Sequence, residues 1–256
     1  MSVELTTRDG VAVLHLNRPQ ALNALNAEML GMIDARLGDV AASDARALLI
    51  VGNGGKAFCA GADVKELQGK DADTQRATAQ RGQGVFAKLD ALRVPSVAVI
   101  TGVAFGGGLE LAMACTFRIA TSSSRLALPE IKLGLLPGYG GTQRLPRLVG
   151  TARALELIAS GRVVDATEAE RIGLIHRIVD GGDPVAEGMR FLASLGAPFP
   201  AALVQAMEAI RRAPHLPLAQ GLAVEADLFA AASQTHDAAE GMQAFLDKRK
   251  PAFIGA

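Results

Sequence analysis

The chain has 256 residues, half of them hydrophobic, and its 26 basic residues balance 26 acidic ones. This length allows one large domain or one domain with an appendage. A net charge of zero argues against binding to nucleic acid or to an anionic membrane mainly through electrostatic attraction. A local basic patch is still compatible with this net charge.

Several other classes of protein are disfavoured by what the sequence lacks. The N-terminus lacks a charged segment followed by an apolar one, so we expect no secretory signal. The longest apolar run, 94–109, is broken by Pro95 and glycines, so we expect no membrane span. We therefore place the protein in the cytoplasm. Cys59 and Cys115 could form one bridge, but two reduced, buried thiols suit a cytoplasmic protein better. The four histidines have no ligand-like spacing, so we expect no metal site.

The first fifty residues predict a hairpin, a helix and a buried strand. Alternating apolar residues flank Asp9-Gly10, which is a strong signal for a tight β-turn. Asn26 is a plausible N-cap, because the apolar residues that follow it keep helical spacing as far as Val40. The run ALLIVGNGG then indicates a buried strand that ends in a turn.

The middle of the chain continues the alternation of strands and helices. KAFCAGADVKEL is a loop that turns into a helix, and VFAKLDALRVP has helical spacing up to Pro95. The polar stretch 68–83 between them fits a solvated helix or a mobile flap equally well. SVAVITGVAFGGG is a strand that leads into three glycines and a helix, and FRIAT is a further strand.

Strand signals stop near Val179. Before that point, the segment 151–179 predicts a helix, a short extended piece, a helix and a strand, with Asp165 or Thr167 capping the second helix. After Gly181-Gly182 only helical patterns remain, and they carry more apolar residues than three helices can bury among themselves. We therefore predict an α/β body over residues 1–182 and a helical C-terminal segment over residues 183–256.

The glycine run at 106–108 is the first chemical signal. A strand that ends in glycines and opens a helix leaves backbone N–H groups bare, and the helix dipole favours an oxygen with negative charge there. Close helix packing or a phosphate-binding turn would explain the glycines as well. Glu110, one turn further on, repels phosphate and favours acid–base chemistry.

Two further features extend this signal. A second turn of small residues lies between a strand and a helix, at Ala60-Gly61-Ala62-Asp63. It is either only a turn or the source of a second N–H for the negatively charged oxygen, as in an oxyanion hole. Glu130 lies among leucines and an isoleucine, and burial there would raise the pKa of its carboxyl group. The alternative is that Glu130 faces solvent on a short helix. Two neighbouring carboxylates would separate their pKa values into an acid and a base.

Four segments together resemble the crotonase (enoyl-CoA hydratase/isomerase) superfamily, and enoyl-CoA hydratases within it most closely. They are KAFCAGADVKEL, GVAFGGGLELAMAC, LPEIKLGLLPGYGGTQRLPRLVG and DAAEGMQAFLDKRKPAF, which keep the order and spacing of the family over essentially the whole chain. The resemblance implies an α/β fold, a spiral of ββα units followed by a helical trimerisation segment. It also implies a homotrimer or a homohexamer built as a dimer of trimers.

The resemblance implies a hydro-lyase that adds water syn across a 2-enoyl-CoA to give a 3-hydroxyacyl-CoA. The backbone N–H groups of Ala62 and Gly107 would bind the thioester oxygen. Glu110 would help to activate the water that attacks Cβ, and Glu130 would supply the proton to Cα. No separate cofactor is expected, because coenzyme A is part of the substrate.

The resemblance also implies contacts with coenzyme A and with the acyl chain. The residues concerned are Lys56, Ala60, Gly61, Asp63, Val64, Gly106, Tyr139, Phe245 and Lys248. Phe245 and Lys248 match positions that reach the coenzyme A of a neighbouring subunit, although Lys248 is also compatible with an ordinary solvated charge. Tyr139 is the one tyrosine of the chain and would either narrow the acyl pocket or simply pack.

The chain departs from the family pattern at one structural position, and two alternative functions fit the sequence. Thr116 replaces a frequent aspartate at a position that is structural in relatives. A different superfamily reaction, such as double-bond isomerisation or hydration of a branched enoyl-CoA, is one alternative. A CoA- or RNA-binding protein with little catalysis is the other, which both glutamates and the zero net charge disfavour. Acyl chain length and the pathway, whether fatty-acid β-oxidation or another acyl-CoA route, stay open.

Overall fold

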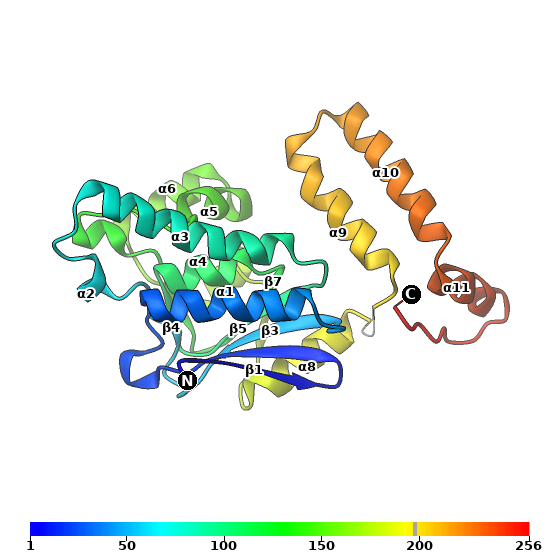
Figure 1. Cartoon of the computed structure of the whole chain (residues 1–256), viewed down its shortest axis with the longest axis horizontal. Helices are drawn as coiled ribbons and strands as arrows, with labels where there is room; N and C mark the ends of the chain where they lie inside the picture. Colours follow the sequence, from blue (N-terminus) through cyan, green and yellow to red (C-terminus); the bar gives the residue numbers. More distant parts are fainter. Residues whose placement is uncertain (197–198, 256) are drawn as a thin grey trace. The chain divides into compact units, whose positions relative to one another are not determined.

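The computed structural model describes residues 1–196 and 199–255, which form two compact units (Figure 1). The first unit, Met1–Arg190, is an α/β body, and the second, Phe191–Ala256, carries the C-terminal helices. The division falls inside helix α8 (Pro184–Ser194), a few residues after the glycine pair at which the sequence predicts the change of character.

The body contains two mixed sheets. The larger one has strands in the order β1 (Val3–Arg8), β2 (Val11–Leu16), β3 (Ala47–Gly52), β5 (Ser96–Ile100), β7 (Phe117–Thr121) and β10 (Arg177–Val179). The smaller one has the order β4 (Ala57–Cys59), β6 (Val103–Phe105), β8 (Arg125–Ala127) and β9 (Val164–Asp165). In both sheets the spatial order follows the chain order.

The alternation of strands between the sheets produces a spiral. The strand pairs β3–β4, β5–β6 and β7–β8 each give one strand to the larger sheet and the next to the smaller sheet, and a helical segment follows each pair. Neighbouring strands of successive pairs are parallel in both sheets. The predicted succession of ββα units is confirmed.

Eight helices and two 3₁₀ turns complete the described part of the body. They are η1 (Pro19–Ala21), α1 (Ala27–Ala41), α2 (Val64–Leu67), α3 (Ala72–Ala91), α4 (Gly107–Ala114), η2 (Glu130–Leu133), α5 (Gly141–Val149), α6 (Thr151–Ser160), α7 (Ala166–Arg171) and the greater part of α8. The stretch 68–83, which the sequence left open, belongs largely to α3, a single helix that runs on through the predicted helix before Pro95.

Local sequence signals account for several boundaries. Asp9 and Gly10 have φ values of +50° and +75° in the turn between β1 and β2, as a tight hairpin requires. The Asn26 side chain accepts a hydrogen bond from the Met29 N–H at 2.9 Å and caps α1. Asp165, and not Thr167, caps α7 through the Glu168 N–H.

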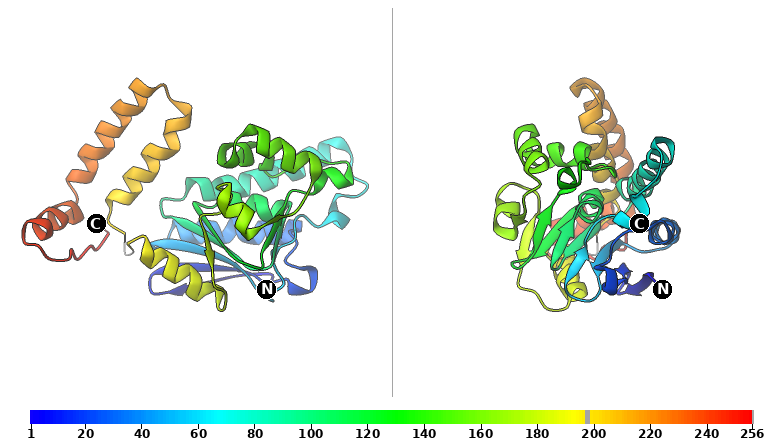
Figure 2. Two further views of the ribbon diagram at one scale, coloured as in Figure 1. Left: turned by 180° about the vertical axis from the view of Figure 1, so that it is seen from behind. Right: turned by 90° about the vertical axis from the view of Figure 1, so that its left-hand side faces the viewer.

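The two faces of the larger sheet are covered by different helices, α1 and α3 on one side and α8 on the other (Figures 1 and 2). Leu14, Leu48 and Ile50 point into the main core together with residues of α1, α3 and α4. On the opposite face, Gly188 of α8 packs so closely that an added Cβ would lie 2.7 Å from the Leu49 side chain.

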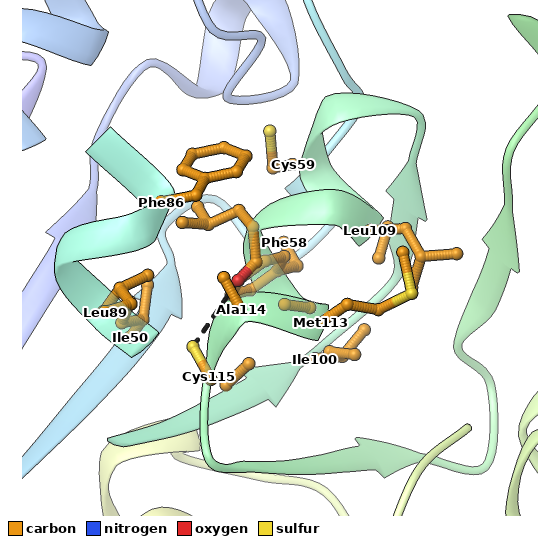
Figure 3. Packing of buried hydrophobic residues seen from close by; sticks show 14 of the residues in the cluster. Ile50, Phe58, Cys59, Phe86, Leu89, Ile100, Leu109, Met113, Ala114 and Cys115 are labelled. Carbon is orange, nitrogen blue, oxygen red and sulfur yellow. Dashed lines mark hydrogen bonds between the residues drawn. The ribbon is translucent and has the colours of Figure 1, made fainter. Parts of the chain in front are cut away.

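Helix α4 lies inside this core and is buried on every side. Figure 3 shows Leu109, Met113 and Ala114 of this helix among Phe58, Phe86 and Ile100. Both cysteines are buried and free, as predicted. A helix held so completely cannot shift easily, so it is a rigid support for the side chain of Glu110.

The second unit contains α9 (Ala202–Arg212), η3 (Ala213–His215), α10 (Leu218–Ser233) and α11 (His236–Leu246), as the helical patterns predict. The buried carboxylate of Asp237 accepts hydrogen bonds from the N–H groups of Ala201, Ile254 and Gly255, which tie both ends of this unit together. Large apolar side chains stay exposed, among them Leu218, Phe229 and Phe245.

Candidate active site

Two backbone turns meet where β4 and β6 end. These strands are parallel neighbours, so the turn at Gly61-Ala62 and the turn at Gly106-Gly107 emerge from the same end of the smaller sheet. A Cβ placed on Gly107 would lie 3.3 Å from the Ala62 nitrogen. Within the described residues, no acceptor is assigned to the N–H of Ala62 or of Gly107. Two bare donors therefore lie side by side.

Each glycine beside these donors has a definite steric reason. Gly106 has φ +49° and ψ −124°, a backbone conformation that residues with a side chain rarely adopt. A Cβ there would also lie 2.9 Å from Oε1 of Glu130, and a Cβ on Gly108 would lie 2.1 Å from the Cys59 carbonyl oxygen. The glycine run thus lets α4 approach β4 and brings Glu130 against the turn.

Glu110 lies in the first turn of α4 and is 1% exposed. Its Oε1 accepts hydrogen bonds from the backbone N–H groups of Tyr139 at 2.8 Å and Gly141 at 2.7 Å. Burial, assisted by the nearby Glu130 carboxylate, outweighs these bonds and raises the pKa of Glu110 to about 7. Since both donors bind Oε1, Oε2 is left for another partner, and the group can change protonation state near neutral pH.

Glu130 opens the short turn η2, directly after Pro129. Burial raises the pKa of this carboxyl group also, in the direction that its apolar neighbours predict. Its Oε2 is buried, and no donor or acceptor within the described chain lies at hydrogen-bonding distance from it. A buried carboxyl oxygen without a partner is costly for folding, which points to a partner outside the protein.

These groups line one cavity of about 200 Å³. The two bare donors and the two carboxyl groups contribute its polar part, while small and apolar side chains of α2, α3 and the segment 129–139 supply most of the remainder. The cavity therefore combines a place for an oxygen that gains negative charge with two acid–base groups in apolar surroundings.

Most of the predicted site residues in the body line this cavity. They are Ala60, Gly61, Ala62, Val64, Gly106, Gly107, Glu110, Glu130 and Tyr139. Lys56 instead lies exposed in the turn before β4. The Asp63 carboxylate accepts a hydrogen bond from the Lys65 N–H and pairs with Arg18 at 2.9 Å, so it holds the loop in shape. Phe245, 82% exposed, and Lys248 lie in the second unit, at the end of α11 and just beyond it.

Sequence reasoning missed two groups of residues at this site. The first is the inner side of α3, where Gln75, Thr78 and Ala79 line the cavity. The second is the backbone of the PGYGG turn, where the Gly141 N–H binds Glu110. The turn was singled out for its tyrosine side chain, and a backbone N–H leaves no mark in a sequence.

Another, larger cavity lies at the carboxyl ends of the parallel strands of the larger sheet. It measures about 450 Å³ and is lined by His15, Asn53, Thr101, Ser123, Asp183 and neighbouring loop residues. The Asp183 side chain accepts hydrogen bonds from the first N–H groups of α8, and His15 lies beside Asn53 and Thr6. The two carboxylates of this cavity, Asp180 and Asp183, are exposed, so the cavity has no buried acid–base pair comparable to Glu110 and Glu130.

Residues 1–196 and 199–255 contain neither a metal-binding cluster nor a membrane-spanning helix. No group of three or more histidine, cysteine, aspartate or glutamate side chains is placed to hold a metal ion. No helix in the same residues is long and apolar enough to cross a membrane.

Known proteins with similar sequences share one family description. The sequence model of the family described as enoyl-CoA hydratase/isomerase matches residues 6–256. The chain is 39% identical to a crotonyl-CoA hydratase of Syntrophomonas wolfei, over 99% of this chain and 98% of the relative. It is 38% identical to a short-chain-enoyl-CoA hydratase of Clostridium acetobutylicum, over 97% of this chain and 96% of the relative.

Solved structures give the same result for the fold. The crystal structure of an enoyl-CoA hydratase from Bacillus anthracis superposes with a TM-score of 0.94 at 35% identity, covering 100% of both chains.

Proposed function

Because the chain belongs to the enoyl-CoA hydratase/isomerase family, we propose that it adds water to a 2-enoyl-CoA and releases the 3-hydroxyacyl-CoA. One observation supports this reaction above others. Two carboxyl groups with different hydrogen bonding, Glu110 and Glu130, share a cavity with two bare backbone donors. Addition of water to a conjugated thioester needs a base, an acid and a site for the developing oxyanion.

The N–H groups of Ala62 and Gly107 bind the thioester oxygen in this proposal. They withdraw electron density from the conjugated system, so that Cβ becomes electrophilic and negative charge collects on the oxygen in the transition state. The donors are fixed before substrate arrives, because β4, β6 and the buried helix α4 hold them.

The two glutamates divide the proton transfers. Oε2 of Glu110 accepts a proton from the water as the water oxygen attacks Cβ, and Oε1 stays bound to the Tyr139 and Gly141 N–H groups. Glu130 delivers a proton to Cα on the same face, which gives syn addition. The C=C π bond and one O–H bond of the water are broken, and one C–O and one C–H bond form. The proton left on Glu110 then passes to Glu130 directly or through solvent, which restores the starting protonation states of both glutamates.

The coenzyme A part of the substrate lies over the loop 56–64 in this proposal. Val64 is 53% exposed at the edge of the cavity, and Lys56 carries a free positive charge nearby in sequence. Phe245 and Lys248 would contribute from a neighbouring subunit of a homotrimer or homohexamer, and a lysine there would meet a phosphate of coenzyme A.

The test is hydration of crotonyl-CoA, followed by loss of the enoyl absorbance. Glu110→Gln and Glu130→Gln each keep the size of the side chain and remove its acid–base function, so we expect a loss in kcat of roughly 10²-fold or more for each. Glu28→Gln, which changes an exposed glutamate in the first turn of α1, serves as the matched control and should keep the wild-type rate. Wild-type turnover in both cavity variants would refute the assignment.

A panel of acyl-CoA substrates covers the alternatives within the family. Turnover of 3-enoyl-CoA without hydration of crotonyl-CoA would indicate an isomerase, and turnover of branched substrates alone would indicate a different hydratase.

A further inference from the structure

The ring of Tyr139 is wedged between helices α3 and α4. A Cβ on Gly82 of α3 would lie 2.3 Å from Cδ1 of this ring, and a Cβ on Gly107 of α4 would lie 3.1 Å from Cδ2. Phe86 meets the ring edge to face, with centroids 5.8 Å apart and an interplanar angle of 87°. Tyr139 is only 6% exposed, so its position is closely determined by its neighbours.

Gly82 has no backbone reason to be glycine. It lies inside α3 and does not have a positive φ, and glycine in a helix costs about 1 kcal/mol relative to alanine. The space that its missing side chain leaves is occupied by Tyr139. The two residues therefore form a matched pair across the helix and the turn.

The position of Glu110 shows which part of a substrate would meet this ring. In the proposed reaction, Oε2 of Glu110 takes a proton from the water that attacks Cβ of the enoyl group. Oε1 of Glu110 accepts a hydrogen bond from the backbone N–H of Tyr139. The ring also borders Gly107, one of the two donors for the thioester oxygen. The substituent on Cβ, which is the start of the acyl tail, is consequently directed toward Tyr139.

Tyr139 also lines a second cavity, of about 110 Å³. Ala62, Leu67, Thr78 and Tyr139 line both this cavity and the one that holds Glu110 and Glu130. The second cavity is also lined by the apolar side chains of Leu25 and Leu30 and by the charged residues Asp63, Glu66, Lys70 and Arg81. Tyr139 has the largest side chain of the four shared residues, so its ring takes up the most space where the two cavities adjoin.

We propose that Tyr139, held in place by the space at Gly82, closes the acyl cavity and restricts this protein to short acyl chains. The inference rests on the proposed hydratase function and adds to it the class of substrate. With a small residue at position 139, the two cavities would join into one longer channel with Leu25 and Leu30 at its end. Tyr139 is a specificity-determining residue in this account, and it takes no part in proton transfer.

The experiment compares kcat/KM for crotonyl-CoA and decenoyl-CoA in the wild-type protein and in Tyr139→Ala, Tyr139→Leu and Tyr139→Phe. Every variant keeps the backbone N–H that binds Glu110. The ratio of decenoyl-CoA to crotonyl-CoA should rise by roughly tenfold or more in Tyr139→Ala, and by less in Tyr139→Leu, because apolar pockets discriminate by about tenfold or more per methylene. Tyr139→Phe keeps the ring and should keep the wild-type ratio.

Binding provides a readout that does not depend on turnover. The Kd of decanoyl-CoA relative to butyryl-CoA, measured by calorimetry, should fall in Tyr139→Ala by about the same factor, while Tyr139→Phe leaves it unchanged. Unchanged ratios in both folded variants, Ala and Leu, would overturn the inference even if the wild-type protein hydrates crotonyl-CoA. A shifted binding ratio without any hydration would instead support the role of Tyr139 and refute the proposed function.

Discussion

At the scale of single residues, Glu110 and Glu130 are both carboxyl groups in an apolar cavity, but their hydrogen bonding differs. A carboxyl group inside an apolar cavity must be neutral or must find donors. Glu110 has two backbone donors on one oxygen, whereas Oε2 of Glu130 has none within the described chain. The two carboxyl groups therefore differ in their hydrogen bonding, while burial raises the pKa of both, that of Glu110 to about 7.

The raised pKa of Glu110 predicts a pH-dependent cost to stability. Its pKa in the folded state is about 7, against an ordinary value of 4.5. The folded state thus prefers the protonated form of Glu110. The contribution of protonated Glu110 to the free energy of unfolding is complete below pH 4.5 and is lost as the pH rises through 7. Glu110→Gln removes the ionisation, and its stability relative to wild type should rise by up to about 3 kcal/mol over this range.

Urea denaturation near pH 5 and near pH 8, at equal ionic strength, measures this difference. Glu28→Gln, an exposed substitution in α1, is the control variant under the same two conditions. An equal stability difference between Glu110→Gln and wild type at both values would show that burial of Glu110 carries no such cost.

At the scale of elements, the site depends on how closely the turn before β4 is held. Asn23 is completely buried, and its Nδ2 donates to the carbonyl oxygens of Asn53, Ala57 and Phe58, at 3.0, 2.9 and 3.3 Å. Its Oδ1 accepts from the Arg18 N–H at 2.9 Å. One side chain thus connects the loop before α1 to the strand that leads to the Ala62 donor.

Replacement of Asn23 by alanine should be strongly destabilising, because it leaves several buried backbone groups without partners. We expect a loss of about 3 kcal/mol in the free energy of unfolding. Asn26→Ala removes only a part-buried helix cap and should cost about 1 kcal/mol, which makes it the matched comparison on the same loop. Chemical denaturation of both variants tests this, and equal losses would contradict the role assigned to Asn23.

At the scale of the whole molecule, the second unit presents apolar residues that its own helices do not cover. Helix α10 has no fully buried residue, and Leu218, Leu222 and Phe229 along it are 79%, 54% and 75% exposed. Exposed apolar surface of this kind is typical of an interface between subunits. It supports the proposal of a homotrimer or homohexamer.

A charge placed on this surface should weaken the assembly. We expect Phe229→Asp to shift the mass measured by light scattering after size-exclusion chromatography toward the monomer, because an interface cannot bury an unpaired carboxylate cheaply. Glu225→Gln, a change of charge on the same helix, should leave the mass close to that of wild type. A monomeric wild-type protein at micromolar concentration would refute the proposal.

The sequence by itself determined the features that depend on neighbouring residues. The hairpin at Asp9-Gly10, the cap at Asn26, the succession of strand pairs and helices, and the end of strands near Val179 all follow from local turn chemistry and periodicity. Four ordered motifs also identified the family, and they named half of the residues that line the cavity.

Only the tertiary structure decided the contacts between distant segments. Glu110 is held by N–H groups 29 and 31 residues away, Tyr139 occupies space left by Gly82, and Asn23 binds carbonyl groups 30 or more residues away. A backbone donor is the same in every residue except proline, and a glycine does not indicate which neighbour fills its space. Such partners are specified by the path of the whole chain, and this is why many residues of the cavity could be predicted while the groups that hold them in place could not.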